Sequence, residues 1–363
     1  MSERASCTVR TEQREEEGMK MTWRRQVLIF LIAAIGLALL NDCSPKSAPK
    51  KKFKVGWSID TITTPFNAAE DKAVKEGWAK YPEVELYSAE AQAQSIKQVS
   101  DIEDLVAKGI ELLIVKPRDE KTLVDTFKNV MKKGIPVVLI DRYVEGDAYT
   151  IFVGSDNVEV GRAAAEVMAK ELNGKGDIAL IEGTPGASSY LERTEGFNEV
   201  LKKYPGLKLI ASQPCLAKRD EGKKLTENWL QGYGAKIKGI HSNTDEITMG
   251  VIQALKEAGR KDVIVTSVNG QMEALKQIID GAIAMTVAYS PGVHPGIELS
   301  WAILNSEKEI PKKILIPAVN VGVEEARKYY DPNIYLFDYI PGGSPAYKEA
   351  EKRYPIIAKL KRR

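Results

Sequence analysis

Residues 135–142, IPVVLIDR, hold the pattern that decides the fold of this chain. The apolar run Val137–Ile140 has the length and the branched side chains of a strand buried on both faces of a sheet. An amphipathic stretch at Thr122–Lys133 precedes it and predicts a helix. The run ends at once in Asp141 and Arg142, so a polar pair is expected at the carboxyl end of a buried strand.

The same alternation of apolar runs and amphipathic stretches continues from Phe53 to Ala288. In the first half, further strands are expected at Lys54–Ile59, Val84–Tyr87 and Leu112–Val115, and further helices at Ala68–Tyr81 and Ser95–Lys108. In the second half, helices are expected at Gly161–Leu172, Tyr190–Lys203, Asp220–Tyr233, Asp245–Ala258 and Met272–Gly281, and strands at Asp177–Glu182, Lys208–Ser212, Ile237–His241, Val263–Val268 and Ala284–Ala288. Such alternation predicts an α/β protein with two similar doubly wound parallel-sheet lobes.

The composition fits a globular protein of two domains and excludes several classes of site. Of the 363 residues, 44 % are hydrophobic and 28 % are charged, enough to bury a core. The 52 basic and 50 acidic residues nearly cancel, so charge alone does not indicate nucleic-acid binding. The three cysteines, Cys7, Cys43 and Cys215, form no CxxC pair, which argues against a structural zinc site and against a disulfide in the body.

The first fifty residues have the pattern of an export signal. Lys20, Arg24 and Arg25 precede the uninterrupted apolar run Val27–Leu40. As a helix this run would be about 21 Å long, shorter than a membrane-spanning helix prefers. We expect residues 1–42 to be a signal or anchor segment.

Cys43 follows the apolar run, and residues 43–52 have the composition of a flexible tether. The arrangement resembles a bacterial lipoprotein signal, in which the cysteine becomes the lipidated first residue. Leu40 fits that pattern, whereas Asp42 stands where a small uncharged residue is usual. The alternatives are an uncleaved anchor or a different cleavage site. In each case we expect an exported body, in the periplasm or at the cell surface, and we expect it to be tethered to the membrane unless the signal is cut elsewhere.

Ligands of parallel α/β sheets bind beyond the carboxyl ends of the strands. The segments that follow the expected strands are polar with interspersed aromatic residues: Ser58–Phe66, Lys116-Pro117, Asp141-Arg142, Glu182–Arg193, Asn243–Glu246, Asn269-Gly270 and Tyr289. They contain no glycine-rich phosphate loop, which argues against nucleotide binding by that route.

These segments, in this order and spacing, resemble the ribose-binding-protein-like substrate-binding proteins of ABC transporters, which have the type I periplasmic binding fold. The resemblance covers residues 53–330 and rests on Thr64-Pro65-Phe66, residues 135–142, Gly154–Asn157 with Gly161, Glu192–Phe197, Thr244–Glu246 with Gly250, and Val268–Gly270. It implies a three-strand hinge, with crossings near Ser155-Asp156, Tyr289-Ser290 and Val319-Asn320. The implied lobes are residues 53–155 plus 290–319 and residues 156–289 plus 320–363.

The resemblance also implies a sugar site. Asp141 and Arg142 match the pair that grips sugar hydroxyls, since a carboxylate accepts from two hydroxyls and a guanidinium donates in a fixed fork. Arg193 matches an arginine that reaches in from the second lobe, and Phe66 matches an aromatic ring that packs on the sugar. Other interpretations remain for these residues. Asp141 and Arg142 could form an ion pair at the surface, Arg193 could be a solvent-exposed helix residue, and Phe66 could be part of the hydrophobic core of its lobe.

At other expected ligand positions the chain departs from the family pattern. Thr64 and Thr244 stand at asparagine positions, and Asn243 would substitute for Thr244 if the loop were shifted. Three further departures are Asn67 where a second aromatic is common, Asn269 where an aspartate is usual, and Tyr289 in place of a polar hinge residue. We therefore expect a ligand other than ribose: a different pentose, a hexose or a cyclic polyol.

Several other residues have more than one interpretation. Trp57 fits the core or a ligand contact, and Asp60 fits a hydroxyl acceptor or a turn. His241 and His294 lack metal-ligand spacing, so we expect no metal and no cofactor.

The resulting hypothesis is a monomeric solute-binding protein that closes two lobes on a sugar or polyol and delivers it to an ABC transporter permease. The alternative is a sensor that presents the ligand to a chemoreceptor or histidine kinase. The sequence has no GxSxG, HExxH or Cys/His arrangement, which argues against an enzyme. The membrane signal stands where a transcription regulator of this fold would need its DNA-binding segment, so we expect no nucleic-acid partner.

Overall fold

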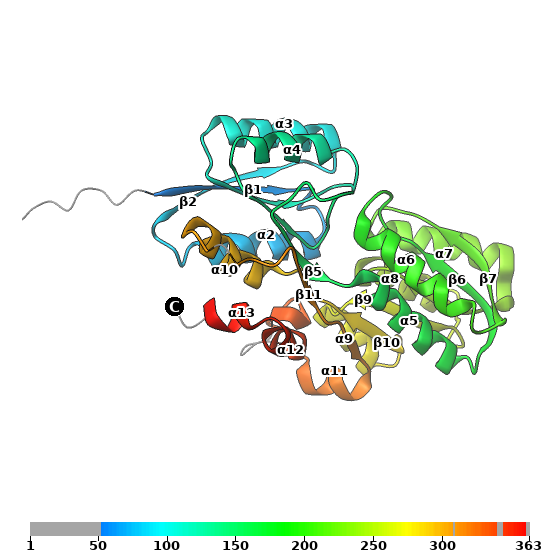
Figure 1. Ribbon diagram of the computed structural model, residues 1–363. Coiled ribbons are helices and arrows are strands. Elements are labelled where there is room, and N and C mark those ends of the chain that lie inside the picture. The colour runs from blue at the N-terminus through cyan, green and yellow to red at the C-terminus, as the bar shows by residue number, and fades with distance from the viewer. Residues whose placement is uncertain (1–51, 308, 340–343, 361–363) are drawn as a thin grey trace, which may run out of the picture. The chain divides into compact units, whose positions relative to one another are not determined.

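The computed structural model describes residues 52–307, 309–339 and 344–360, and within them the chain forms two six-stranded sheets (Figure 1). The first lobe is built on a wholly parallel sheet of order β11-β5-β4-β3-β1-β2. Its strands are β1 (Phe53–Ile59), β2 (Val84–Glu90), β3 (Leu112–Lys116), β4 (Val137–Ile140), β5 (Ile151–Ser155) and β11 (Lys313–Ile316). Its helices are α2 (Pro65–Trp78), α3 (Ser95–Ala107), α4 (Val124–Lys132) and α10 (Val293–Leu304).

The second lobe repeats this plan with the sheet order β12-β10-β9-β8-β6-β7, in which β12 alone runs antiparallel to its neighbour. Its strands are β6 (Lys175–Ile181), β7 (Gly206–Gln213), β8 (Ile237–Ser242), β9 (Ile264–Asn269), β10 (Met285–Ala288) and β12 (Val319–Val321). Its helices are α5 (Asn157–Glu171), α6 (Ser188–Leu201), α7 (Arg219–Tyr233), α8 (Asp245–Glu257), α9 (Met272–Ile279) and α11 (Val323–Tyr329), with short 3-10 turns at Gly234–Lys236 and Phe337–Tyr339. The predicted α/β class with two doubly wound lobes is confirmed.

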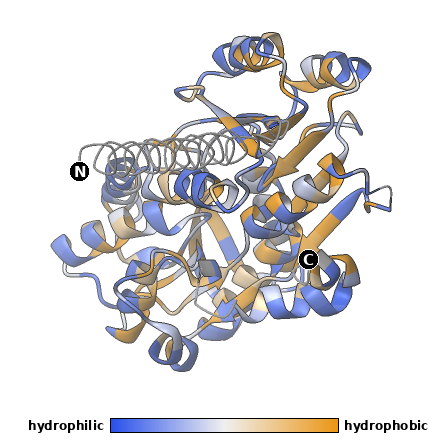
Figure 2. Ribbon diagram, turned by 90° about the vertical axis from the view of Figure 1, so that its left-hand side faces the viewer, coloured by the Kyte–Doolittle hydropathy of each residue, from blue (hydrophilic) through white to orange (hydrophobic). Residues whose placement is uncertain are grey.

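Each sheet is covered on both faces because its strands carry apolar side chains on both sides. In the first lobe, Val55 and Trp57 of β1 pack with α2 and α10, whereas Leu113 of β3 packs with α3 and α4 on the opposite face. In the second lobe, one face packs on α5 and α6 and the other on α7, α8, α9 and α11. In Figure 2 the strands are largely hydrophobic and the helices carry hydrophilic residues on their outer sides.

The chain passes between the sheets at three places. Two of them, after β5 and after β10, fall where the crossings were expected, and the third lies between Ile316 and Val319, just before the expected position. Ser155 and Ser290 join two of the crossings: the Ser155 hydroxyl donates to the Ser290 carbonyl at 3.2 Å and accepts from the Ser290 amide at 3.1 Å. Asp338 accepts from the Ser290 hydroxyl at 2.8 Å.

The carboxyl-terminal helices require a correction to the expected lobe boundary. Residues 320–363 were assigned to the second lobe, but α12 (Pro345–Arg353) and α13 (Pro355–Leu360) pack on the first. Tyr347 and Ile357 are buried in the same core as Val55 and Ile314. The reason is that both helices carry apolar residues that cover the face of the first sheet beside α10. The predicted signal, Cys43 and tether lie outside the described residues.

None of the helices that the structure describes has both the length and the hydropathy required to cross a membrane.

Glycines on α5 and α6 allow these two helices to pack closely. A Cβ added at Gly161 would lie 2.0 Å from the carbonyl oxygen of Arg193, so the backbones touch here. We expect Gly161→Ala to lower the free energy of unfolding by about 1–3 kcal/mol, because the clash is with backbone and not with a flexible side chain. Urea denaturation measures the change.

Gly232→Ala is the matched control, since Gly232 is also helical and a Cβ there meets nothing within 4 Å. It is expected to raise the free energy of unfolding by about 0.5–1 kcal/mol through helix propensity alone. Equal effects of the two substitutions would contradict the close packing of α5 on α6.

Candidate functional site

A cavity of about 410 Å³ lies at the carboxyl ends of strands from both sheets. This volume is within the range of about 300–1,000 Å³ that small-molecule sites usually have. The first lobe lines it with Asp60, Thr64, Phe66, Asn67, Arg118 and Arg142, among others. The second lobe contributes Tyr190, Thr244, Glu246 and Asn269, among others. The predicted location beyond the strand ends is where the cavity lies.

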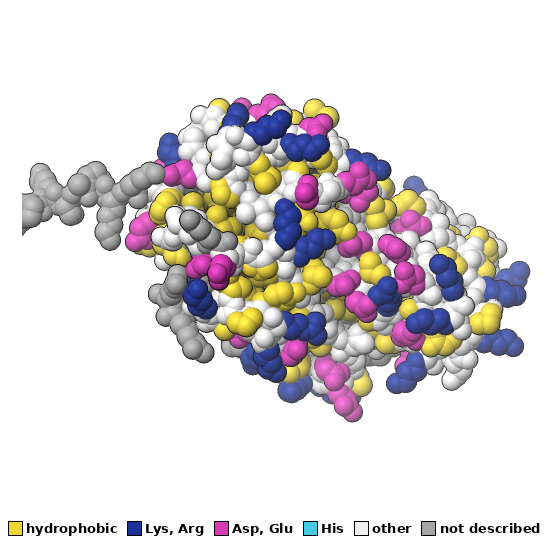
Figure 3. Space-filling view, in the orientation of Figure 1, with side chains coloured by type: hydrophobic (Ala, Val, Ile, Leu, Met, Phe, Trp, Pro, Cys, Tyr) yellow, Lys and Arg dark blue, Asp and Glu magenta, His cyan; other side chains and the backbone are white. Residues whose placement is uncertain are grey.

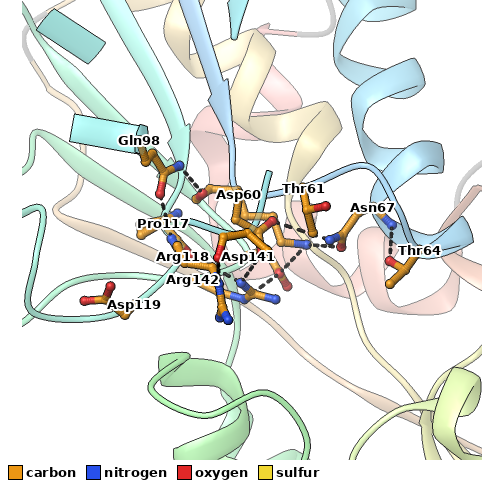
Figure 4. A network of polar contacts seen from close by, with 12 residues as sticks. Asp60, Thr61, Thr64, Asn67, Gln98, Pro117, Arg118, Asp119, Asp141 and Arg142 are labelled. Carbon is orange, nitrogen blue, oxygen red and sulfur yellow. Dashed lines mark hydrogen bonds and ion pairs between the residues drawn. The ribbon is translucent and has the colours of Figure 1, made fainter. Parts of the chain in front are cut away.

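Arg142 follows β4 and lines the cavity, although its side chain is almost fully buried. Its Nη1 donates to Asp60 at 2.8 Å and to the Pro117 carbonyl at 3.3 Å (Figure 4). Burial lowers the pKa of Arg142, but Asp60 and Asp141 outweigh burial and hold that pKa above its ordinary value. Its Nε is buried without a hydrogen-bond partner among the described groups and lies 3.7 Å from Asp141 Oδ2. Arg142 therefore lines the cavity with a charged guanidinium that is ion-paired to Asp60.

Asp141 lies behind this wall and is bonded by protein groups. Its Oδ1 accepts from the Tyr289 hydroxyl at 2.9 Å, and its Oδ2 lies 2.9 Å from Lys116 Nζ. Burial raises the pKa of Asp141, but Lys116 together with Arg142 and Arg193 outweighs burial and holds that pKa below its ordinary value. The φ angle of Asp141 is 62°, a left-handed conformation that costs free energy and turns the carboxylate toward these partners. Asp141 does not line the cavity.

Lys116 is fully buried at the end of β3 and holds several oxygens at once. Besides Asp141, its Nζ donates to Asn67 Oδ1 at 2.9 Å and to Glu70 Oε2. Burial raises the pKa of Glu70 to about 8, even though the nearby Lys116 lowers it. Burial thus favours the protonated form of Glu70. We refer to Lys116, Glu70, Asn67, Asp141 and Tyr289 as the buried lysine network.

Arg193 of α6 is held by groups of its own lobe. Its Nε donates to Asn157 Oδ1 at 2.9 Å and its Nη1 donates to the Asn243 carbonyl at 2.7 Å. The guanidinium lies 4.2 Å from the ring centroid of Tyr289, and its Nη2 has no partner among the described groups. Arg193 does not line the cavity.

One aromatic ring, that of Tyr190, contacts the arginines of both lobes. The guanidiniums of Arg142 and Arg193 lie 5.6 and 5.4 Å from the centroid of the Tyr190 ring, which lines the cavity. Phe66 also lines the cavity and stacks on Tyr289, with the centroids 5.8 Å apart and the planes 21° apart. The structure thus brings Asp141, Arg142 and Arg193 into one region, but of these three only Arg142 lines the cavity.

The second lobe contributes a free acceptor. Asn269 donates through Nδ2 to Thr244 Oγ1 at 2.8 Å, so its Oδ1 is left without a partner among the described groups. Both residues line the cavity. Asn243 instead binds the Glu182 carbonyl and Thr194 and does not line the cavity.

Thr64 and Asn67 line the cavity and also serve the local structure. Thr64 caps α2 by accepting from the Asn67 amide at 3.3 Å, and Pro65 then starts the helix. Trp57 is core, with its indole nitrogen donating to Asp71 at 3.0 Å. Asp60 lines the cavity while its carboxylate is held by Arg142 and Asn67.

Sequence reasoning missed the cavity residues Glu90, Gln92, Ala93 and Arg118. β2 extends to Glu90, three residues past its expected end, which brings the following turn to the cavity. Arg118 directly follows the segment Lys116-Pro117 that had been singled out, and its Nε donates to the Ala93 carbonyl at 3.2 Å. The two charges that flank Pro117 after a buried strand were the available signal.

The described histidine and cysteine side chains that had been considered for chemistry are structural. His241 is fully buried, stacks on Phe197 and binds Thr266 and Asn243; burial lowers its pKa to about 4. Burial raises the pKa of Cys215 to about 12. In the part of the chain that the structure describes, no group of three or more His, Cys, Asp or Glu residues is placed to hold a metal ion.

Comparison with known proteins decides the family, since residues 55–307 match the periplasmic binding protein domain. The chain belongs to the periplasmic binding protein domain family. This periplasmic binding protein is 32 % identical to the ribose import binding protein of Bacillus subtilis, over 72 % of its own length and 88 % of the relative. It is 31 % identical to the xylitol-binding protein of Mycolicibacterium smegmatis, over 85 % of its own length and 91 % of the relative.

A solved structure agrees with this family. An ABC transporter solute binding protein from Bacillus halodurans with bound myo-inositol superposes with a TM-score of 0.74 at 30 % identity, covering 78 % of this periplasmic binding protein and 99 % of the other chain. The family consists of ligand-binding proteins, and the resemblance stated from the sequence is confirmed.

The raised pKa of Glu70 makes stability depend on pH in a definite direction. Because the folded protein keeps this proton up to about pH 8 and the unfolded chain releases it near 4.5, Glu70 stabilises the fold below pH 4.5. That contribution is lost as pH rises toward 8, with a slope of up to about 1.4 kcal/mol per pH unit. The slope is expected to be smaller in Glu70→Gln, as measured by urea denaturation from pH 5 to pH 8.

Glu76→Gln on the exposed face of α2 serves as the control, because its side chain is 66 % exposed. It should leave the pH dependence as in the wild type. A Glu70→Gln curve that runs parallel to the wild-type curve would mean that Glu70 is ionised in the folded protein.

Proposed function

We propose that this protein is the solute-binding component of an ABC transporter, and that it captures a small sugar or polyol between its two lobes. In this proposal the lobes move as units about the chain segments that join them, close on the ligand and present it to a membrane permease. The protein acts as a monomer, binds no cofactor and catalyses no reaction. The described cavity wall contains neither histidine nor cysteine, in keeping with a binding role.

The observation that carries the proposal is the chemistry of the cavity wall. Sugar rings have apolar faces and polar edges, so they need an aromatic side chain together with hydrogen-bonding groups. Phe66 supplies the ring, and the Arg142 guanidinium and the Asn269 side-chain amide, which line the cavity from opposite lobes, supply donors and an acceptor. A guest held between them would bridge the lobes.

The relatives support a polyhydroxylated ligand. Two of them are named for ribose import and for xylitol binding, and the superposed structure contains myo-inositol. These three ligands share a compact framework with adjacent hydroxyls. The name of the first relative also favours import over the alternative of sensing.

An exported location follows from the same proposal. We propose that residues 1–42 direct export to the periplasm or cell surface, and that lipidation of Cys43 tethers the body to the membrane. On the face drawn in Figure 3, Lys and Arg are intermixed with Asp and Glu, unlike the continuous basic surface that nucleic-acid binding proteins present.

Binding is measured by isothermal calorimetry of the purified body against pentoses, hexoses and polyols. We expect at least one to bind, and we expect Phe66→Ala to weaken its binding about tenfold or more through loss of stacking. Ile62→Ala is the control, since Ile62 is exposed in the same loop and does not line the cavity. Folded protein that bound no carbohydrate would refute the proposal.

A further inference from the structure

The acidic groups around the cavity already accept hydrogen bonds from the protein. Both oxygens of Asp141 are engaged, by Tyr289 and by Lys116. Asp60 accepts from Arg142 at 2.8 Å and from Asn67 at 3.4 Å. Each of these four oxygens therefore has fewer lone pairs free for the hydroxyls of a guest.

The two remaining acids of the cavity wall are engaged as well. Glu90 accepts from the Ile62 amide at 3.2 Å. Glu246 accepts from Arg219 Nε at 2.9 Å and from the Tyr335 hydroxyl at 3.0 Å. A guest thus meets carboxylates that already have partners.

Two cationic side chains lie together at this wall and retain unused donors. Arg142 and Arg118 both line the cavity, and Arg142 Nε and Arg118 Nη1 are buried without hydrogen-bond partners among the described groups, with Arg142 Nε 3.7 Å from Asp141 Oδ2. They follow the neighbouring strands β4 and β3, and Figure 4 draws them beside each other at the strand ends. Burial lowers the pKa of Arg118, and repulsion by Arg142 lowers it further. Two like charges in a partly desolvated site favour an anion between them.

We propose that the ligand is a sugar acid, a monosaccharide-sized polyol with one carboxylate, and that Arg118 and Arg142 bind the carboxylate. Phe66 then packs on the carbon framework, and the free Oδ1 of Asn269 accepts from a hydroxyl. This inference rests on the proposed function and narrows its ligand class. Arg118 gives the site its preference for the sugar acid, because it contacts the carboxylate that the neutral sugar lacks.

The test compares matched pairs by isothermal calorimetry at pH 7: D-glucuronate with D-glucose, D-galacturonate with D-galactose, and D-gluconate with D-glucitol. In at least one pair the acid is expected to bind at least tenfold more tightly than its neutral partner. Arg118→Gln should weaken the acid at least tenfold and the neutral partner less than threefold. Arg118→Lys, which keeps the charge, should retain part of the preference and shows that the position tolerates substitution.

Lys121→Gln is the control for general charge effects, because Lys121 lies on the same loop with its side chain 71 % exposed. It should leave the ratio of acid to neutral affinity unchanged. Tighter binding of the neutral sugar in all three pairs, or equal weakening of both members by Arg118→Gln, would overturn the inference while the proposed function stands. If neither acids nor neutral sugars and polyols bind, the proposed function and this inference fall together.

Discussion

Lys116 carries its charge at a place in the first lobe where water does not reach it. Such a charge is tolerated only when oxygens surround it, and Glu70, Asn67 and Asp141 supply them. Each of these oxygens is thereby committed to one orientation. Moving one of these oxygens away would leave the buried Lys116 charge without a partner, which costs free energy. The network therefore determines which side chains are free to face the cavity. Arg142, next to Asp141 in sequence, is the group that this arrangement leaves at the wall.

Tyr289 extends the network to the junction between the lobes. It lies on the segment that leaves β10, donates to Asp141 and supports the guanidinium of Arg193 on its ring. A residue next to a crossing moves least when two lobes rotate about it, so the Tyr289–Asp141 bond can persist through such a rotation. Residues farther from the crossings, such as Arg118, move most relative to the opposite lobe. The junction is thus the rigid end of the cavity, and the end near Arg118 is where selection among ligands can take place.

The fold was predictable because it depends on patterns that are local in sequence. Buried parallel strands read as short apolar runs, and the residue after each run necessarily lies at the same edge of the sheet, which placed Arg142, Phe66 and Asn269 at the cavity. The buried lysine network was not predictable, because a lysine after an apolar run normally reaches solvent, and its burial depends on Glu70 from another element. The position of α12 and α13 was missed for a similar reason: their apolar residues do not specify which of two similar lobes they cover.

Taken together, the features of positions 141 and 269 reduce the negative charge that faces the ligand. The resemblance leads one to expect carboxylates at the ligand from both lobes, one at 141 and one at 269. At 269 the chain has an amide, and at 141 the carboxylate is present but bonded by Lys116 and Tyr289. Both features leave less negative charge free to face the ligand, and Arg142 and Arg118 line the cavity beside them. This arrangement reduces the repulsion of a guest carboxylate and adds attraction from two cations.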